Sequence, residues 1–329
     1  MNKREFIKRS IVGAVAIGAS GAGSAAFAET AAKPRKPKTL KKKLGKTGFE
    51  VYPVIYGGIV SMQDGQKASD NYVAWALDRG INYFDVAPSY GDAEEKLGLS
   101  LKPFRKDNYL ACKTTQRLRE GAEKEFEKSL ELLHTDYFDV YQLHSISKPE
   151  DVEQIFGPNG IMEMIEKEKQ RGRIRKVGFS AHSQEQAIRA MSMYDFDSIM
   201  FPTNWQMIKL DGWGAGAVNE AKRRGMGVLA IKGLTHRRWL ENEKKDSRYQ
   251  KSWCKPIDVE NRELGVAALK FTFQAGADAI IPPGDFRNFS FCVDNIAEIL
   301  DSPLSKKEKT LLDNEFLAVK DYPFFDPRT

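Results

Sequence analysis

The chain has few of the residues that form disulfide bonds or metal sites. Its 329 residues include three cysteines and four histidines, and neither set shows the close paired spacing of a zinc or dithiol motif. We therefore predict no metal site. Three cysteines leave at least one thiol unpaired, and a chain of this length can bury a large core without disulfides. Cys112, which ends an apolar run, is expected to be a buried, unreactive thiol.

Beyond residue 43 the chain also lacks an excess of positive charge. The formal net charge of the whole sequence is +6, but residues 1–43 hold eleven Lys and Arg against two Glu, which is +9 and leaves −3 for the remainder. The sequence pI of about 9.0 therefore belongs to the N-terminal segment. It does not indicate a nucleic-acid partner.

A long, strongly apolar run is missing as well. Ile11–Ala28 comes nearest to one, but it is rich in Ala and Gly and lies at the short end of the membrane-spanning range. Basic residues precede it, and a small-x-small site ends it, as in an export signal. We predict that residues 1–28 are a cleaved signal peptide, recognised by the export machinery, which sends the protein to the periplasm. Asn2–Lys8 resembles a twin-arginine signal with Lys3 in the first arginine position. A Sec signal and a membrane anchor are the alternatives.

The segment after the predicted signal is basic and contains two prolines. Residues 29–43 carry seven Lys and Arg, which is typical of a solvated linker. The folded domain is predicted for residues 44–329. It is expected to begin with a hairpin over Leu44–Tyr52, because a Lys-Thr-Gly turn separates two short apolar pieces.

Eight apolar, strand-like runs follow, and amphipathic segments separate most of them. The runs are Pro53–Tyr56, Ile81–Phe84, Asn108–Cys112, Phe138–Leu143, Ile174–Phe179, Ser198–Phe201, Gly227–Ile231 and Asp278–Ile281. The helical segments include Ser69–Arg79, Gly121–Leu133, Gly160–Arg171, Gln184–Met193, Ala217–Arg224 and Arg262–Gln274. No G-x-G-x-x-G follows the first run, as a doubly wound dinucleotide fold would need. We predict an α/β fold, a (β/α)8 TIM barrel, with the irregular segment Gly233–Asn261 over its mouth.

Polar residues stand at the ends of three consecutive runs. Asp85 and Tyr90 follow the second run, Lys113 the third and His144 the fourth. Because the carboxyl ends of parallel strands meet at the mouth of a barrel, we expect these four side chains to converge there.

Such a set can deliver a proton to a carbonyl oxygen. A phenol has an ordinary pKa of about 10, and the Lys113 ammonium is expected to lower the pKa of Tyr90. Asp85 would keep Lys113 charged and in place. His144 can donate to the substrate oxygen and orient the carbonyl. With a hydride donor at the carbonyl carbon, these residues predict a carbonyl-reducing enzyme with Tyr90 as proton donor.

These residues also carry a family resemblance. Leu44–Gly48, Gly57-Gly58, Phe84–Gly91, Lys113-Thr114 and Leu143-His144 resemble the aldo-keto reductase superfamily, over a span from about Leu40 to about Asp321. The resemblance implies a TIM barrel that transfers hydride between a nicotinamide cofactor and an aldehyde, ketone or sugar. It makes Asp85, Tyr90, Lys113 and His144 the catalytic tetrad of this chain.

The resemblance further implies residues that bind the cofactor. They are Ser180, Asn204, Ile231, Lys232, Arg287 and Asn295. Ile231 would cover the nicotinamide face, and Lys232 would reach a phosphate. Members of the family commonly use NADP, but only Arg287 is cationic in the phosphate-binding segment, and Asp285 would repel a 2′-phosphate. The expected cofactor is therefore NADP or NAD.

A protein with a barrel fold can keep its ligand-binding site and have no catalytic activity. One alternative is thus a regulatory or binding protein that holds the cofactor without turnover, although the intact tetrad favours the enzyme. Four tryptophans are candidates for lining a substrate pocket, namely Trp205, Trp213, Trp239 and Trp253.

Overall fold

The computed structural model describes residues 40–245 and 247–325. Its main sheet has eight parallel strands in the order β12-β9-β8-β7-β6-β5-β4-β3. They are β3 (Tyr56–Gly57), β4 (Tyr83–Asp85), β5 (Tyr109–Thr114), β6 (Phe138–Ile146), β7 (Ile174–Ala181), β8 (Ser198–Pro202), β9 (Gly227–Ile231) and β12 (Ala279–Ile281). The sheet closes next to β3, where the Ile55 amide donates to the Ile280 carbonyl and the Ile280 amide to the Pro53 carbonyl, both at 2.9 Å. The predicted (β/α)8 barrel is confirmed, and each predicted run supplies one strand.

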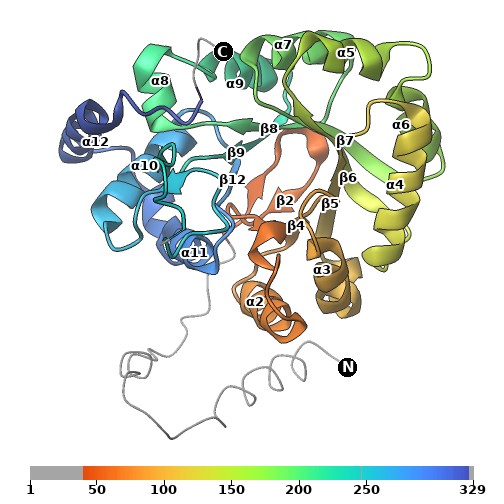
Figure 1. Cartoon of the computed structure of the whole chain (residues 1–329), viewed down its shortest axis with the longest axis horizontal. Coiled ribbons are helices and arrows are strands. Elements are labelled where there is room, and N and C mark those ends of the chain that lie inside the picture. Colours follow the sequence, from red (N-terminus) through yellow and green to blue (C-terminus); the bar gives the residue numbers. More distant parts are fainter. Residues whose placement is uncertain (1–39, 246, 326–329) are drawn as a thin grey trace, which may run out of the picture.

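Helices surround the strands and cover the outer face of the barrel (Figure 1). They are α2 (Gln66–Asp78), α3 (Ala93–Leu101), α4 (Arg119–Leu132), α5 (Pro149–Phe156), α6 (Ile161–Gln170), α7 (Gln184–Met193), α8 (Trp205–Asp211), α9 (Ala215–Arg223), α10 (Arg262–Gln274), α11 (Phe286–Asp301) and α12 (Lys306–Val319). Short 3-10 helices lie at Gly58–Val60 and Lys102–Asp107. In α4 the buried positions Ala122, Phe126 and Leu130 form one apolar stripe against the strands, as the helical spacing predicts.

The predicted hairpin closes the amino-terminal end of the barrel. Strands β1 (Lys42–Lys43) and β2 (Glu50–Val51) pair in antiparallel fashion around a 3-10 turn at Gly45–Thr47. Leu44 and Val51 are fully buried in the inner core. Gly45 has a φ of +46°, and a Cβ there would lie 2.2 Å from the Gly227 amide nitrogen, so only glycine fits. The hairpin is confirmed, but its first strand lies in the segment predicted as linker.

The segment between β9 and α10 crosses the mouth of the barrel. We call residues 233–261 the insertion. It contains a short antiparallel ribbon of β10 (Thr235–Arg237) and β11 (Lys255–Pro256), which the sequence analysis did not predict. Lys251 ties the insertion to the segment after β3, because its Nζ lies 2.6 Å from the Asp64 carboxylate and 3.0 Å from the Val60 carbonyl oxygen.

The predicted signal peptide, residues 1–28, lies outside the described residues, as does most of the predicted linker. Over residues 40–245 and 247–325, no helix combines the length and apolar character that a membrane span requires.

Candidate active site

A cavity of about 560 Å³ opens at the carboxyl ends of the barrel strands. Strand ends and the loops that follow them supply Asp85, Tyr90, His144, Ser180 and Ile231 to its lining. The insertion and the C-terminal segment complete its outer wall. The residues predicted to carry out the chemistry therefore meet at this cavity.

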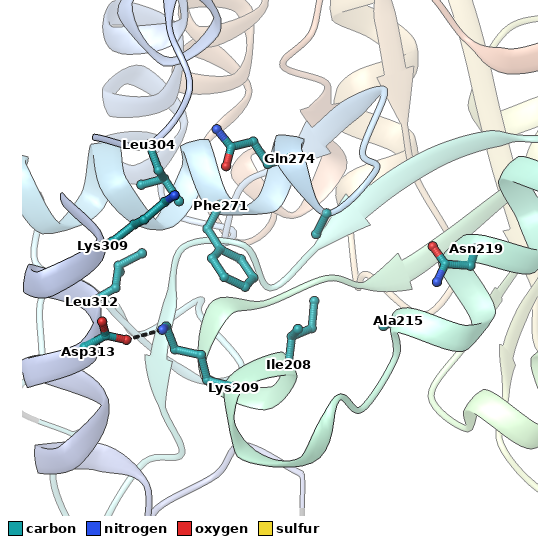
Figure 2. A pocket seen from close by; sticks show the side chains of 11 residues that line it. Ile208, Lys209, Ala215, Asn219, Phe271, Gln274, Leu304, Lys309, Leu312 and Asp313 are labelled. Atoms are coloured by element: carbon teal, nitrogen blue, oxygen red, sulfur yellow. Dashed lines mark hydrogen bonds and ion pairs between the residues drawn. The ribbon is translucent and has the colours of Figure 1, made fainter. Parts of the chain in front are cut away.

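A second cavity, of about 470 Å³, lies between helices on the outside of the barrel. Figure 2 shows Phe271 and Leu312 among its lining side chains, with Lys209 and Asp313 paired at its edge. No predicted site residue lines it. We therefore assign the chemistry to the mouth of the barrel.

Lys113 is the centre of the buried polar cluster in the mouth. It lies on β5, is fully buried, and forms an ion pair with Asp85 at the end of β4. Its Nζ also donates to the Tyr90 hydroxyl oxygen at 3.2 Å. Burial alone would lower the pKa of Lys113, but the Asp85 carboxylate and the Tyr90 hydroxyl raise it above its usual value. Lys113 is therefore a permanent cation placed next to the phenol.

The pKa of Tyr90 is raised above its ordinary value, whereas a lowered pKa was expected. Burial raises the pKa of this phenol, and the Lys113 ammonium offsets only part of the increase. Lys113 thus lowers the pKa of Tyr90 as expected and the predicted contact is present, but burial outweighs it and the pKa does not fall below its ordinary value. A phenol with a raised pKa keeps its proton at neutral pH, so Tyr90 holds a proton that it can donate.

His144 lies beside Tyr90 and is neutral at neutral pH. The two rings are edge to face, with centroids 5.9 Å apart. Burial, followed by the positive charge of Lys113, lowers the pKa of His144 to about 3. Its Nδ1 is buried without a hydrogen-bond partner among the described residues. The register between β6 and β7 shifts just after Leu143, the kind of irregularity that re-aims side chains beside active sites.

Gln142 is a member of the cluster that the sequence analysis missed. It is fully buried on β6, opposite Lys113 in the strand register, and its amide Nε2 donates to Asp85 Oδ1 at 2.8 Å. Asp85 thus has one carboxylate oxygen on Lys113 and the other on Gln142. The alternation of β6 could have revealed it, since Gln142 and His144 are two residues apart and share the inner face.

A comparison with known proteins agrees with this geometry. The model of the Aldo/keto reductase family matches residues 57–265, which include all four members of the predicted tetrad. The chain belongs to the aldo/keto reductase family. Its curated relatives include an uncharacterized oxidoreductase, YqkF, of Bacillus subtilis (strain 168), 31% identical over 155 residues, 43% of this chain and 48% of that protein. The L-galactose dehydrogenase of Arabidopsis thaliana is 31% identical over 154 residues, 42% of this chain and 47% of that one. The chain spans about half the length of these relatives.

Solved aldo-keto reductases share the fold of the chain. The holo form of an aldo-keto reductase from Bacillus halodurans superimposes with a TM-score of 0.61 at 22% identity, covering 84% of this chain and 96% of that one. A glycerol dehydrogenase from Gluconobacter oxydans gives a TM-score of 0.62 at 19% identity, covering 88% and 99%. At these identities the likeness concerns the TIM barrel alone.

Three of the residues predicted to bind cofactor line the cavity of this aldo/keto reductase. They are Ser180, Ile231 and Lys232. The Ser180 hydroxyl accepts a hydrogen bond from the Ser145 amide at 2.7 Å. Among the described residues no acceptor takes its own hydrogen, which is thus available to a ligand.

The other three predicted cofactor residues do not line the cavity. Asn204 is fully buried, and its carboxamide caps α8 and donates to the Lys232 carbonyl at 2.8 Å. Asn295 donates within α11 to the Phe291 carbonyl at 2.7 Å. Arg287 is exposed on the first turn of α11. Both asparagine side chains therefore hydrogen-bond to the protein's own backbone. These bonds satisfy carbonyl groups, and for Asn204 also the first amides of α8, that would otherwise lack partners.

Asp285 is engaged by the insertion. Its carboxylate accepts from the Ser252 hydroxyl at 2.8 Å, and Ser252 also accepts from the Asn288 amide at 3.3 Å. Burial raises the pKa of Asp285, although this hydrogen bond and the nearby Lys251 oppose the shift. Asp285 therefore holds the insertion down on the start of α11.

The outer wall contains residues that the sequence analysis did not single out. Cys254, Phe324 and Phe325 line the cavity. Of the four candidate tryptophans only Trp253 does so, and it is 69% exposed. Trp205 is fully buried beneath the mouth. No strand period or turn motif marks these positions, so composition alone could not select among them.

Proposed function

We propose that this chain is a nicotinamide-dependent oxidoreductase. It transfers a hydride between the cofactor and the carbon of an aldehyde, ketone or sugar carbonyl, or of the corresponding alcohol, and Tyr90 is the proton donor. The observation that carries the proposal is the position of Lys113, which joins Asp85 to Tyr90 at the bottom of an open cavity. A protein that only bound a ligand would not need a buried lysine directed at a phenol, because burying charges is costly.

The residues present fit a nicotinamide. Met200, Ile231 and Ile281 give the cavity an apolar wall, suited to the face of a planar ring. The Ser180 hydroxyl is available to the carboxamide at the rim of that wall, and Lys232 supplies a cation. The cofactor would provide the hydride in reduction and accept it in oxidation.

The protein's own groups manage the proton. In reduction the Tyr90 hydroxyl transfers its proton to the carbonyl oxygen as the hydride reaches the carbon, and the resulting phenolate is stabilised by the Lys113 ammonium at 3.2 Å. Neutral His144 hydrogen-bonds the same oxygen and orients the carbonyl. Asp85 and Gln142 hold Lys113 in position. In alcohol oxidation the Tyr90 phenolate takes the proton back.

Replacing Tyr90 tests the proposal. Tyr90→Phe should bind reduced cofactor normally but lose at least about 10²-fold in aldehyde turnover, because only the acidic hydrogen is removed. Tyr109→Phe is the matched control. Tyr109 stands at the end of β5 away from Lys113, and a phenylalanine there can still stack on Phe49. Near-normal turnover of Tyr90→Phe would exclude Tyr90 as the donor.

We propose a modest preference between NADP and NAD. Arg287 and Lys232 are the cations available for a 2′-phosphate, while the Asp285 carboxylate lies at the start of α11 and opposes it. The ratio of the two affinities is expected to be under about 10²-fold, or roughly 3 kcal/mol. Fluorescence titration with both cofactors measures this ratio, and strict selectivity for NADP would contradict it.

We also propose that residues 1–28 direct folded protein, with its cofactor bound, through the twin-arginine route to the periplasm. The basic start, the weakly apolar stretch and the small-x-small site support this. The insertion would retain the cofactor through the Lys251–Asp64 and Ser252–Asp285 contacts. Protein recovered from the periplasm should contain stoichiometric cofactor. Cofactor that washes out freely, with micromolar or weaker affinity, would contradict the retention, and protein found only in the cytoplasm would contradict the export.

A further inference from the structure

Arg117 contacts the backbone of the histidine that lies beside Tyr90. It stands between β5 and α4, and its side chain is 10% exposed. Its Nη2 donates to the His144 carbonyl at 2.8 Å and to the Ser145 carbonyl at 3.3 Å. Its Nε donates to the Asp151 carboxylate at 2.9 Å. A guanidinium presents its donors in a fixed plane, which allows one side chain to hold two carbonyls and a carboxylate at once.

The backbone that Arg117 holds has an unusual conformation. Ser145 has a φ of +60°, in the left-handed region that costs free energy for most residues other than glycine. The Ser145 amide donates to the Ser180 hydroxyl at 2.7 Å. Its carbonyl accepts from the Ser147 hydroxyl at 3.1 Å as well as from Arg117. The strain therefore lies in the residue that follows His144, and three side chains maintain it.

Asp151 fixes the guanidinium in turn. It stands in the first turn of α5, where its Oδ2 accepts from the Ser147 amide at 2.8 Å and from the Lys148 amide at 3.0 Å. Burial raises the pKa of Asp151, but these two amides and Arg117 outweigh it and lower the pKa below its ordinary value. Asp151 is therefore ionised at neutral pH, and its pair with Arg117 joins the segment after β5 to the start of α5.

The imidazole of His144 depends on this backbone for its direction. Its Nδ1 has no hydrogen-bond partner among the described residues, so no bond at that atom holds the ring. The ring packs edge to face on Tyr90. Arg117 is not among the residues that line the cavity, so its effect on a substrate passes through the residues that it holds.

We propose that Arg117 is a positioning residue of the reaction. By holding the His144 and Ser145 carbonyls, it keeps the imidazole directed at the carbonyl oxygen of the substrate, beside the Tyr90 hydroxyl. The inference rests on the proposed function of the site. It assigns to Arg117 an effect on turnover, in addition to any effect on the stability of the fold.

Arg105 offers a matched control at the other end of the barrel. It is similarly buried, pairs with Asp139 at 2.9 Å, and donates to the Asn108 and Tyr137 carbonyls at 2.9 and 2.8 Å. These partners stand at the amino ends of β5 and β6, away from the tetrad. A purely structural role predicts similar consequences for the loss of either arginine, whereas a positioning role predicts reduced turnover for Arg117 alone.

The test is a double-mutant cycle between Arg117 and His144, with 4-nitrobenzaldehyde and saturating NADPH. Arg117→Met should lower kcat by about 10-fold, the loss expected when hydrogen bonds from a charged group are removed. In the His144→Gln background the same replacement should lower kcat by under about 2-fold, since the side chain through which Arg117 acts is gone. Arg117→Lys should show the same pattern at smaller size, and it replaces Arg117→Met if that variant does not fold. Arg105→Met should lower the free energy of unfolding and leave the kcat of the folded protein within about 2-fold of native.

Equal losses of kcat in the native and His144→Gln backgrounds would overturn the inference, and so would a loss of the same size in Arg105→Met. A readout without turnover separates the inference from the proposed function. In NMR spectra of protein with isotope-labelled histidine, the ring signals of His144, assigned by their absence from His144→Gln, should shift in Arg117→Lys and stay in place in Arg105→Lys. If the native protein reduces neither 4-nitrobenzaldehyde nor glyceraldehyde, the proposed function fails, and these signals still decide whether Arg117 positions the imidazole. Unmoved His144 signals in Arg117→Lys would overturn that role.

Discussion

The two halves of the barrel mouth are built differently. On the side of β4, β5 and β6, the functional groups stand on strands or in the loop that follows β4, and Asp85 and Lys113 hold each other as a buried ion pair. Asp85 and Lys113 have 1% and 0% of their surface exposed. Around the rest of the mouth, the insertion covers the side of β9 and β12, and the C-terminal segment packs on His182 after β7 through Phe325. Trp253 of the insertion and Phe325 are more exposed than Asp85 and Lys113. The first half is buried and closely connected by hydrogen bonds, which suits it to moving a proton. The second can adapt to ligands and hold them.

Removing the central cation should have the largest effect. Lys113→Met leaves the buried Asp85 carboxylate without its partner, which is expected to destabilise the fold by about 3–5 kcal/mol. Turnover should fall by at least about 10²-fold. Because Lys113 opposes the rise in the pKa of Tyr90, the alkaline limb of any residual reduction should move to higher pH.

The variant Asp85→Asn/Lys113→Met separates stability from catalysis. Urea denaturation should show most of the stability restored, since no uncompensated charge is left, while turnover stays low. Residual activity with an unchanged pH profile in Lys113→Met would mean that Tyr90 does not respond to Lys113.

Gln142 should matter next, as a positioning residue. Gln142→Met removes the donor to Asp85 Oδ1 and is expected to lower turnover by about 10-fold, as the loss of a hydrogen bond to a charged group would. In Gln142→Glu a protonated carboxyl can still donate to Asp85, whereas an ionised one repels it, so activity should shift toward acid pH.

The control for Gln142 is Gln206→Met. Gln206 is also buried and donates to the Val319 carbonyl at 2.7 Å, far along the chain from the tetrad. It should lower stability and leave the pH profile unmoved. A pH profile that is the same in Gln142→Glu as in the native protein would reduce Gln142 to a packing role.

His144 should make stability depend on pH in a defined direction. Burial and Lys113 lower the folded-state pKa of His144 to about 3, so between that value and the ordinary one of about 6.5 only the unfolded chain binds the proton. The stabilisation is therefore present above about pH 6.5 and is lost as the pH falls. His144→Gln should reduce the difference in unfolding free energy between about pH 7.5 and 4.5 by about 1–2 kcal/mol. His134→Asn, at an exposed turn with φ of +49°, is the control. An equal effect in both variants would contradict the assignment.

The smallest effect is expected on the insertion side. Ser252→Ala removes the hydroxyl that donates to Asp285 and should weaken cofactor binding by about 3–10-fold, with less effect on turnover at saturating cofactor. Ser290→Ala, which loses only a contact to the Arg287 carbonyl, is the control. If Ser252→Ala lowered turnover as strongly as Gln142→Met, the contrast between the two halves would not hold.

The same contrast explains what could be predicted from sequence. The strands and the residues at their ends follow from period and spacing, because a barrel places successive strand ends at one mouth. That reasoning located the contact between Lys113 and Tyr90. It gave the effect of Lys113 on the pKa of Tyr90 but not the net rise, since the extent of burial depends on how helices and loops cover the site, and no local pattern reports it.

The residues expected to bind the cofactor show the limit of carrying roles over from a family resemblance. Asn204 was expected at the nicotinamide, but its amide caps α8 and holds the Lys232 turn. Phe324 and Phe325 were not singled out, although both line the cavity. Their places depend on where a long, irregular connection and the end of the chain come to rest, which short-range spacing does not encode.

The hairpin at the closed end of the barrel also has a practical consequence. The described chain starts at Leu40, just before the hairpin whose Lys46 amide donates to the Gly225 carbonyl beside the start of β9, at the end of the barrel opposite the catalytic mouth. An affinity tag, a fused electron-transfer partner or a solid support joined ahead of Leu40 would leave the mouth facing the solution. Immobilised protein should therefore keep its mouth open to bulky ligands, whereas attachment after Phe325 would place the support at the entrance.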